Sequence, residues 1–134
     1  MHKRVAAARV GRLATVTAEG RPHLVPICFV LEGEMLYSAV DEKPKGSKRL
    51  QRLANIRMNR EVCVLVDHYA EDWTRLWWVR LDGTAQVLED GPEREHGLSL
   101  LAAKYEQYRA KPPTGPVIAV RIERWRGWSS ASPG

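Results

Sequence analysis

Seven basic side chains stand close together in the first half of the chain, and they are the residues best suited to chemistry with an anion. They lie between Lys43 and Arg60, a stretch that contains no acidic residue. The whole chain has 21 basic and 16 acidic residues, a formal net charge of +5, so these seven account for all of the positive excess. The seven are Lys43, Lys45, Lys48, Arg49, Arg52, Arg57 and Arg60.

Four environments could receive this charge: a nucleic acid, a membrane surface, the phosphate of a cofactor, or water alone. Solvated helix faces are the commonest role of charge runs, but a one-signed run gains nothing from opposite charges one helical turn apart. Aromatic residues are not interleaved with the cations, which disfavours a nucleic acid. The longest apolar run, from Leu24 to Leu31, is too short to span a bilayer. We therefore expect a cofactor phosphate ahead of a solvated helix face, which stays the alternative, with no nucleic acid and no membrane as partner.

Residues that could perform catalysis by themselves do not form any familiar pattern. The chain has no glycine-rich dinucleotide or Walker-type phosphate loop after a strand and no Gly-x-Ser-x-Gly elbow. No pair of carboxylates stands out as an acid–base couple, so catalytic residues stay unassigned. An enzyme of this kind can still work when a cofactor carries the chemistry, with a bound water or a backbone group delivering the proton.

The histidines and cysteines do not predict a metal site. No metal-ligand spacing occurs among the histidines, and there is no Cys-x-x-Cys pair. The two cysteines stand in apolar runs and are interpreted as small buried thiols, which with the absence of a cleavable signal segment indicates a cytoplasmic protein. His23 and His68 fall on predicted strands and could edge a pocket. These residues are His2, His23, His68, His96, Cys28 and Cys63.

The elements that must position these residues are mostly strands within one domain of 134 residues. Helices do not alternate with single strands, which disfavours a parallel doubly wound sheet and favours an antiparallel barrel, closed or split, with two helices at its edges. About eight residues at the N-terminus and five at the C-terminus are expected to fray, and the segment from 126 onwards reads as irregular. Strands are predicted at 12–17, 23–31, 35–40, 61–69, 76–88 and 117–125, and helices at 48–59 and 92–108; the first three strands read as a meander.

Particular residues mark how these elements begin, bend and face. Ser47 is a good N-cap for the basic helix, and Pro26 inside a strand implies a sheet edge or an irregularity. Gly83 indicates a bulge. Trp77 and Trp78 must point to opposite faces of their strand, so one is core and the other can line a pocket or a dimer interface.

Two stretches of the chain carry a family resemblance over about residues 9–129. The segment "RLATVTAEGRPHLVPICFVLEGEMLYSAVDEKPKGSKRLQRLANI" resembles the opening half of the pyridoxamine 5'-phosphate oxidase-like split β-barrel flavoproteins. The motifs "VDHY…DW…LWWVR" and "GPVIAV…W…GW" are similar to a branch described as coenzyme F420 (deazaflavin)-dependent oxidoreductases. The resemblance implies a mainly β, antiparallel split β-barrel of the FMN-binding-protein type.

The resemblance also implies a function and a site. It implies a homodimer with two cofactor sites at its interface and an F420-dependent oxidoreductase that transfers hydride to a small-molecule substrate. The alternatives are an FMN-binding flavoprotein of the pyridoxamine-phosphate-oxidase type and a cofactor-binding protein without catalysis. The ring would lie against "LVPIC" and "YSAV" and the anionic tail over the basic loop and helix, while Arg80 shares the face of Trp78 and is a candidate anion contact across the dimer or a rim residue. The implied cofactor-binding residues are Pro26, Ile27, Ser38, Ala39, Val40, Lys43, Lys45, Lys48, Arg49, Arg52, Trp78 and Arg80.

Overall fold

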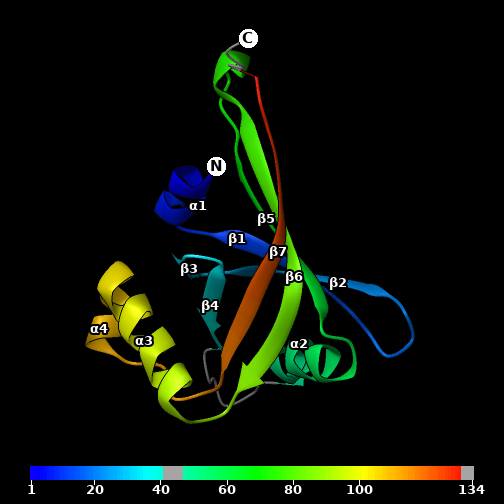
Figure 1. The fold of residues 1–134 in the computed structure, drawn as a ribbon, viewed down its shortest axis with the longest axis vertical. Helices are drawn as coiled ribbons and strands as arrows, with labels where there is room; N and C mark the ends of the chain where they lie inside the picture. The colour runs from blue at the N-terminus through cyan, green and yellow to red at the C-terminus, as the bar shows by residue number, and fades with distance from the viewer. Residues whose placement is uncertain (41–46, 131–134) are drawn as a thin grey trace.

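A computed structural model of the chain describes residues 1–40 and 47–130, and the side chains of residues 47–50 are outside the description. Its largest feature is a seven-stranded, wholly antiparallel sheet in the order β2-β1-β5-β6-β7-β4-β3 (Figure 1). The sheet confirms the predicted antiparallel, mainly β architecture. The strands are β1 (Gly11–Val16), β2 (Pro22–Ile27), β3 (Val30–Glu32), β4 (Met35–Ala39), β5 (Glu61–His68), β6 (Trp77–Leu88) and β7 (Val117–Ser129).

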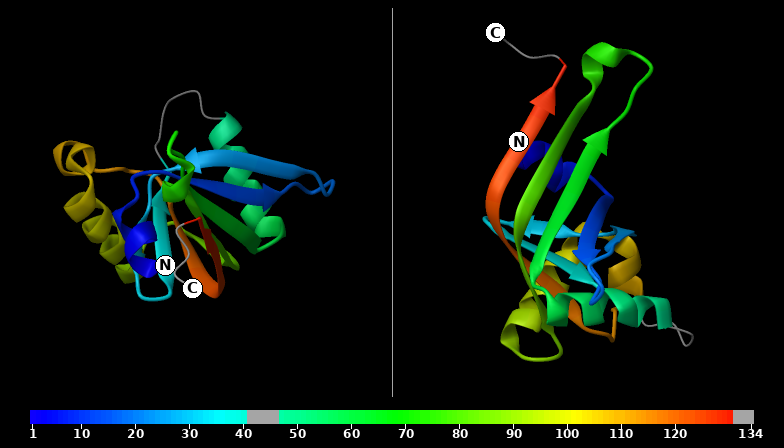
Figure 2. Two further views of the ribbon diagram at one scale, coloured as in Figure 1. Left: turned by 90° about the horizontal axis from the view of Figure 1, so that it is seen from above. Right: turned by 90° about the vertical axis from the view of Figure 1, so that its right-hand side faces the viewer.

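Helices cover the two sides of this sheet at its lower end. The basic helix α2 lies on one side and the pair α3 and α4 on the other (Figures 1 and 2). The helices are α1 (His2–Ala7), α2 (Ser47–Met58), α3 (Pro92–Lys104) and α4 (Glu106–Ala110), with a 3-10 turn η1 (Trp73–Arg75) between β5 and β6. The described part of the chain therefore contains the two predicted helices, the second of them divided at Tyr105, and α1 where a frayed end was expected.

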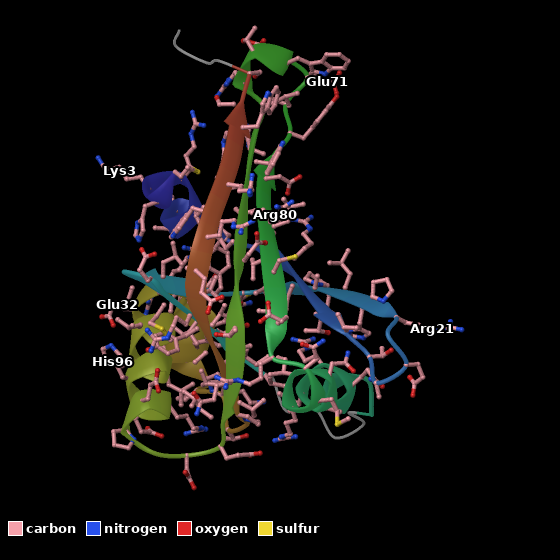
Figure 3. All side chains as sticks on the ribbon, turned by 45° about the vertical axis from the view of Figure 1, so that its right-hand side comes forward. Lys3, Arg21, Glu32, Glu71, Arg80 and His96 are labelled. Carbon is pink, nitrogen blue, oxygen red and sulfur yellow. The ribbon has the colours of Figure 1, made fainter. Side chains whose placement is uncertain are left out.

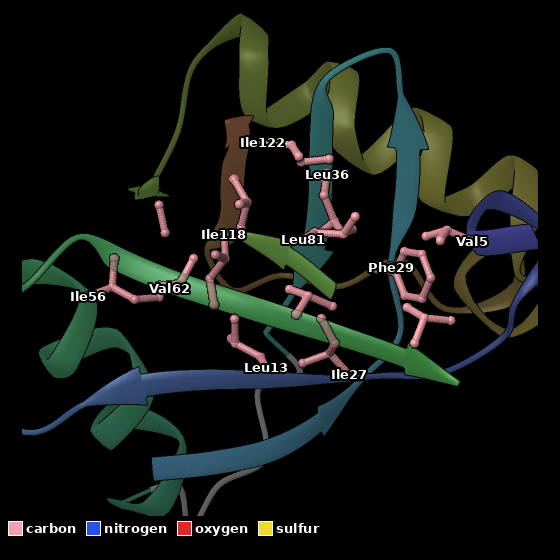
Figure 4. Packing of buried hydrophobic residues seen from close by; sticks show 14 of the residues in the cluster. Val5, Leu13, Ile27, Phe29, Leu36, Ile56, Val62, Leu81, Ile118 and Ile122 are labelled. Carbon is pink, nitrogen blue, oxygen red and sulfur yellow. The ribbon is translucent and has the colours of Figure 1, made fainter. Parts of the chain in front are cut away.

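The core lies inside the curved sheet, where every strand but β3 contributes buried side chains. Figure 4 shows Leu13, Ile27, Leu36, Leu81 and Ile118 packing together there. Alternation explains which residues enter: along β6 the buried positions are every second residue from Val79 to Ala85. Burial on this scale is the main source of stability, at about 1.5–3 kcal/mol for each large apolar side chain.

The predicted meander is confirmed in its two pairings, β1 with β2 and β3 with β4, but wrong as one continuous ribbon, because its middle strand is divided into β2 and β3. The long strand expected at 23–31 stops at Ile27 and resumes at Val30, and the second piece crosses to the other end of the sheet, where β3 pairs with β4 and β4 with β7. Pro26 therefore lies on an edge strand just before an irregularity, as its ring and missing N–H predict. The two halves meet again where the Ser38 hydroxyl donates to the Cys28 carbonyl oxygen over 2.8 Å.

The β6–β7 pair is longer than the sequence indicated and forms a projecting arm with β5. Pairing runs from Leu88↔Val117 to Trp77↔Ser129, so the segment expected to be irregular is a strand as far as Ser129. The register shifts at Asp82/Gly83, as Gly83 predicted; a Cβ there would collide with the carbonyl oxygen of Arg121. The upper halves of β5, β6 and β7, with η1 at the tip, extend beyond the rest of the chain (Figure 2).

Candidate functional site

The candidate ring-binding strand presents only part of its residues to the outside. Pro26 and Leu24 are exposed, Leu24 to 66%, whereas Ile27 is buried in the core. Ser38, Ala39 and Val40, the counterparts from β4 and its end, are also buried. If a ring lies here, Pro26 can offer its side chain, and the four buried residues can offer backbone groups.

The break between β2 and β3 is held by side chains from distant elements. The Phe29 N–H donates to the Tyr105 hydroxyl oxygen over 3.0 Å, and Lys104 Nζ donates to the Phe29 carbonyl oxygen over 2.8 Å. Both holders come from the C-terminal end of α3, where Tyr105 leaves the helix. These two residues were not singled out as polar site residues from the sequence, because their partners lie about 75 residues away.

The charge of Lys104 is affected by its surroundings. Burial, followed by the nearby positive charge of Arg9, lowers the pKa of Lys104 from 10.5 to about 8. Its ammonium group lies 4.1 Å from the centroid of the Phe29 ring. Burial also raises the pKa of Tyr105, which makes that phenol a stable hydrogen-bonding group across the physiological pH range.

The basic helix α2 is fixed to the sheet by a buried polar pair. Asn55 Nδ2 donates to the Thr15 hydroxyl over 3.0 Å, and both residues are at most 2% exposed. Gln51 Nε2 donates to Asn55 Oδ1, the side-chain amide oxygen, on the same helix. Leu53 and Ile56 bury the apolar side of the helix against the core. The rotation of α2 about its axis is therefore set by Asn55, which the helical pattern did not identify.

The seven basic residues divide into groups once the structure is known. Arg57 pairs with Glu89, and Arg60 Nε donates to the Ala85 carbonyl oxygen over 3.2 Å, so these two contact groups of their own chain. Arg52 is partly buried on α2. Lys43 and Lys45 lie outside the described residues, as do the side chains of Lys48 and Arg49. Their predicted contact with an anion stays a prediction.

The outer surface of the sheet brings the other predicted residues together. Register places Arg12 beside Pro26 on one side and Leu65 on the other, and Leu65 beside Arg80. Trp78 is half-buried on this outer surface, whereas Trp77 packs against the core, as the alternation predicted. Arg80 Nε donates to Asp82 Oδ1 over 3.1 Å, and Figure 3 places Arg80 midway along the arm.

Two open hollows lie along this outer surface. One, of about 520 Å³, surrounds the bulge at Gly83 and is lined by Cys63, Asp82 and Arg124 among others. The other, of about 240 Å³, lies near the tip and is lined mainly by Leu65, Tyr69, Trp78 and Trp128. Trp128 is 48% exposed, so it adds apolar surface to the upper part of the arm.

The cysteines and histidines do not form a reactive cluster in the described part of the chain. Cys28 and Cys63 are both half-buried, so the prediction of buried thiols is only partly right. Burial beside Asp82 raises the pKa of the Cys63 thiol, which makes it less reactive. Among the described residues no group of three or more His, Cys, Asp or Glu side chains is arranged to hold a metal ion. No helix formed by those residues is long and apolar enough to cross a membrane.

Comparison with known proteins identifies the family. The pyridoxamine 5'-phosphate oxidase family model matches residues 1–129, and the chain belongs to that family. A curated relative, a 5a,11a-dehydrotetracycline/5a,11a-dehydrooxytetracycline reductase of Streptomyces rimosus, is 35% identical over 82 residues, which are 60% of this chain and 56% of the relative. The match thus spans just over half of the relative's length.

Solved structures show the same fold. A FAD-binding protein from Mesorhizobium loti superposes with a TM-score of 0.69 at 25% identity, over 94% of this chain and 89% of the other. The haem storage protein HutZ of Vibrio cholerae superposes with a TM-score of 0.73 at 17% identity, over 96% of this chain and 91% of the other. These similarities confirm the predicted split β-barrel.

Proposed function

We propose that this protein is an oxidoreductase that binds the deazaflavin coenzyme F420 in preference to flavin mononucleotide and reduces a small substrate. The observation that carries the proposal is that one chain of this family combines an exposed apolar edge strand at Pro26 with a basic helix whose first turn contains no acidic residue. Apolar surface suits a planar ring, and a helix N-terminus favours an anion.

The residues present fit such a cofactor. Pro26 offers an exposed apolar surface, and the buried Ile27, Ser38, Ala39 and Val40 would contact a ring only through backbone atoms that strand pairing and the Val40 N–H bond to Pro116 leave available. Buried Asn55 holds α2 in a fixed orientation, so cations near its start would face a fixed direction. When bound, the cofactor supplies the hydride, and the chain supplies the surface, the hydrogen bonds and the charge.

The relatives support a reductase activity more directly than they support F420 as the cofactor. The Streptomyces relative is a reductase by name, which favours redox catalysis here. The FAD-binding structural neighbour supports the ordinary-flavin alternative, in which flavin mononucleotide takes the same site. The third possibility is a cofactor-binding protein without catalysis. Unlike the first two, such a protein would not reduce an electron acceptor.

We also propose that the protein acts as a homodimer through the outer sheet surface. Leu24, Leu65 and Trp128 are exposed on this surface by 66%, 37% and 48%, and Tyr69 and Trp73 at the tip by 62% and 68%. Apolar patches of this kind are uncommon on monomers. Covering them with a second copy would place Trp78 and Arg80 of each chain beside the partner. Sedimentation equilibrium at micromolar concentration tests this, and a monomer would remove the shared-site model.

Absorbance of the purified protein tests the cofactor. The protein would be produced in a host that makes both F420 and flavins and then released from its cofactor by denaturation. A deazaflavin shows one band near the violet, whereas a flavin shows two. We expect the single band, and turnover of an artificial electron acceptor by the reduced holoprotein separates an enzyme from a carrier.

Substitutions in the basic segment test the anion contact. Lys45→Ala, Lys48→Ala and Arg49→Ala should each weaken cofactor binding by roughly tenfold to a hundredfold, since a charge-assisted hydrogen bond contributes on the order of 1.5–3 kcal/mol. The matched control is Arg57→Ala, because this arginine of the same helix already pairs with Glu89. If all four variants bind the cofactor as tightly as the wild type, the basic segment does not hold the cofactor.

A further inference from the structure

The break between β2 and β3 has backbone groups that no neighbouring strand satisfies. Cys28 and Phe29 lie between the two ladders, and buried backbone groups require hydrogen-bond partners. Side chains provide them. The Phe29 carbonyl oxygen accepts from Lys104 Nζ at 2.8 Å and lies 3.0 Å from the Tyr105 hydroxyl, while the Phe29 N–H donates to that hydroxyl. The conformation of the break thus depends on two residues at the end of α3.

The two residues at the end of α3 are themselves held in place. The Tyr105 hydroxyl lies 2.9 Å from the Arg9 carbonyl oxygen, so its single proton can reach either Arg9 or Phe29. Arg9 Nη2 donates to the Lys104 carbonyl oxygen over 3.1 Å, and its guanidinium lies 4.8 Å from the Tyr105 ring centroid. Tyr105 is 6% exposed. The set of Arg9, Phe29, Lys104 and Tyr105, here called the α3 clamp, therefore links three separate parts of the chain.

The α3 clamp adjoins the strand on which the cofactor ring is placed. Phe29 follows Pro26 by three residues. Between them, the carbonyl oxygen of Cys28 accepts a hydrogen bond from the Ser38 hydroxyl. A shift of the break would move both Pro26 and the backbone of the buried residues that flank Ser38. Small displacements of a binding strand cost affinity because a preorganised site loses its fit.

We propose that Lys104 and Tyr105 are positioning residues for cofactor binding, holding the β2–β3 break so that Pro26 and the adjoining backbone keep the conformation that receives the ring. This inference rests on the proposed function, because it assumes that the ring lies on β2. Neither residue is placed in contact with the cofactor; each acts through Phe29.

Because the charge of Lys104 changes with pH, its positioning role can be tested by measuring cofactor affinity at different pH values. The titratable and charged groups around it are Arg9 from the segment before β1, Cys28 from the break, Tyr105 from its own helix end, and Tyr108 and Arg109 from α4. The pKa of Lys104 is lowered to about 8, first by burial and then by the charge of Arg9. Charge-assisted hydrogen bonds are roughly twice as strong as neutral ones. The hold on the Phe29 carbonyl should therefore weaken as pH rises through about 8.

The test is equilibrium titration of the protein with F420, and separately with flavin mononucleotide, at pH values from 6.5 to 9.5. For the wild type we expect the affinity for the cofactor that binds to fall about fivefold as pH rises, with a midpoint near pH 8. Lys104→Met should bind more weakly at pH 7 and show no such midpoint. Lys104→Arg, which keeps its charge throughout this range, should retain the affinity of the wild type at low pH and also lose the midpoint.

Two further variants separate positioning from other causes. Cys28→Ala removes the thiol at the break itself and should leave the midpoint in place. Tyr105→Phe removes the hydroxyl and should weaken binding at every pH without abolishing the midpoint. Melting temperatures identify the pH range in which each variant is folded, and affinities are compared only there.

The outcomes separate this inference from the function on which it rests. A wild type that binds neither cofactor at any pH overturns the proposed function, and the positioning role with it. A wild type that binds a cofactor, with Lys104→Met binding equally well and with the same pH profile, overturns the positioning role alone. A change in melting temperature without any change in affinity would assign the α3 clamp to folding only.

Discussion

Helices α2 and α3 lie on opposite sides of the same sheet, but different kinds of chemistry attach them to it. Helix α2 is joined to β1 by Asn55 and Thr15, two neutral groups that do not titrate. Helix α3 is joined to the β2–β3 break by Lys104 and Tyr105, and to β4 by the Tyr37 hydroxyl, which donates to Glu93 over 3.1 Å.

This difference separates two tasks within one proposed site. The helix associated with the anionic tail has an orientation that should be independent of pH. The helix that supports the ring strand is attached through groups whose charge changes with pH, because the pKa of Lys104 is lowered to about 8. The comparison predicts that perturbations of α2 act uniformly with pH, whereas perturbations of α3 do not.

The largest effect is expected for Asn55→Ala. It removes a buried amide and leaves the Thr15 hydroxyl without this donor, which should cost about 2–3 kcal/mol of unfolding free energy and lower the melting temperature by roughly 5–10 °C. Thermal unfolding at pH 6 and pH 9 measures this. The loss should be the same at both values, and a marked difference between them would break the contrast between the two helices.

Tyr105→Phe should have the next largest effect. The Tyr105 hydroxyl accepts a hydrogen bond from the Phe29 N–H and can donate to the carbonyl oxygen of Arg9 or of Phe29. In the variant, Lys104 would still donate to the Phe29 carbonyl oxygen. We expect a loss of about 1–2 kcal/mol in urea unfolding. The matched control is Tyr108→Phe on α4, which changes the same group on a partly buried residue; an equal loss in both variants would argue against a special role for Tyr105.

Stability should also rise with pH because of Lys104. Its folded pKa of about 8 lies below the unfolded 10.5, so between these values the unfolded chain holds a proton that the folded chain has lost. The complete difference would amount to about 3 kcal/mol, and because Lys104 is only half-buried we expect roughly 1–2 kcal/mol. Urea unfolding from pH 8 to 10 measures it, and Lys104→Met should flatten the profile.

Above pH 10 the direction should reverse. Burial, followed by the hydrogen bond to Glu93, raises the pKa of Tyr37 from 10.0 to about 12, so the folded chain then holds a proton that the unfolded chain loses. A Tyr37→Phe variant should lack this decline. A wild-type profile that falls steadily from pH 8 would contradict the assignment for Lys104.

The smallest effect is expected for Arg57→Ala on α2. The ion pair with Glu89 is exposed on both sides, 49% and 62% for the two side chains, and such pairs contribute little. We expect a change of at most about 0.5 kcal/mol, decreasing further at high salt. A loss above 1 kcal/mol would mean that the surface charges of α2, and not Asn55, fix its position.

Local pattern predicted the parts of the fold that depend on neighbouring residues. The strands at β1, β4, β5 and β6, the presence of α2 and the bulge at Gly83 followed from alternation, helical periodicity and backbone sterics, whereas the predicted N-cap role of Ser47 stays a prediction. What local pattern missed depends on distant contacts. Helix α1 has only six residues, too few to be stable in isolation, and it is held by buried Val5 and by the contact of His2 with Trp125.

The candidate site could be proposed in type from the sequence, but the packing around it could not. An apolar strand with an internal proline followed by a basic helix was readable along the chain, and family resemblance gave it a meaning. That Ile27 and Ser38 are buried, that Asn55 fixes α2 and that Lys104 reaches Phe29 required the packing of distant segments. The pairing of β4 with β7, about 80 residues apart, could not be inferred from either strand alone.

Competitive binding of F420 and flavin mononucleotide tests the proposed function most directly. Cofactor-free protein would be titrated with each compound separately, following the quenching of tryptophan fluorescence, and then with one in the presence of the other. We predict saturable binding of both to one site per chain, with clearly tighter binding of F420 that weakens as salt is raised. Clearly tighter binding of flavin mononucleotide would contradict the assignment to F420, and binding of neither would contradict a flavin-type cofactor altogether.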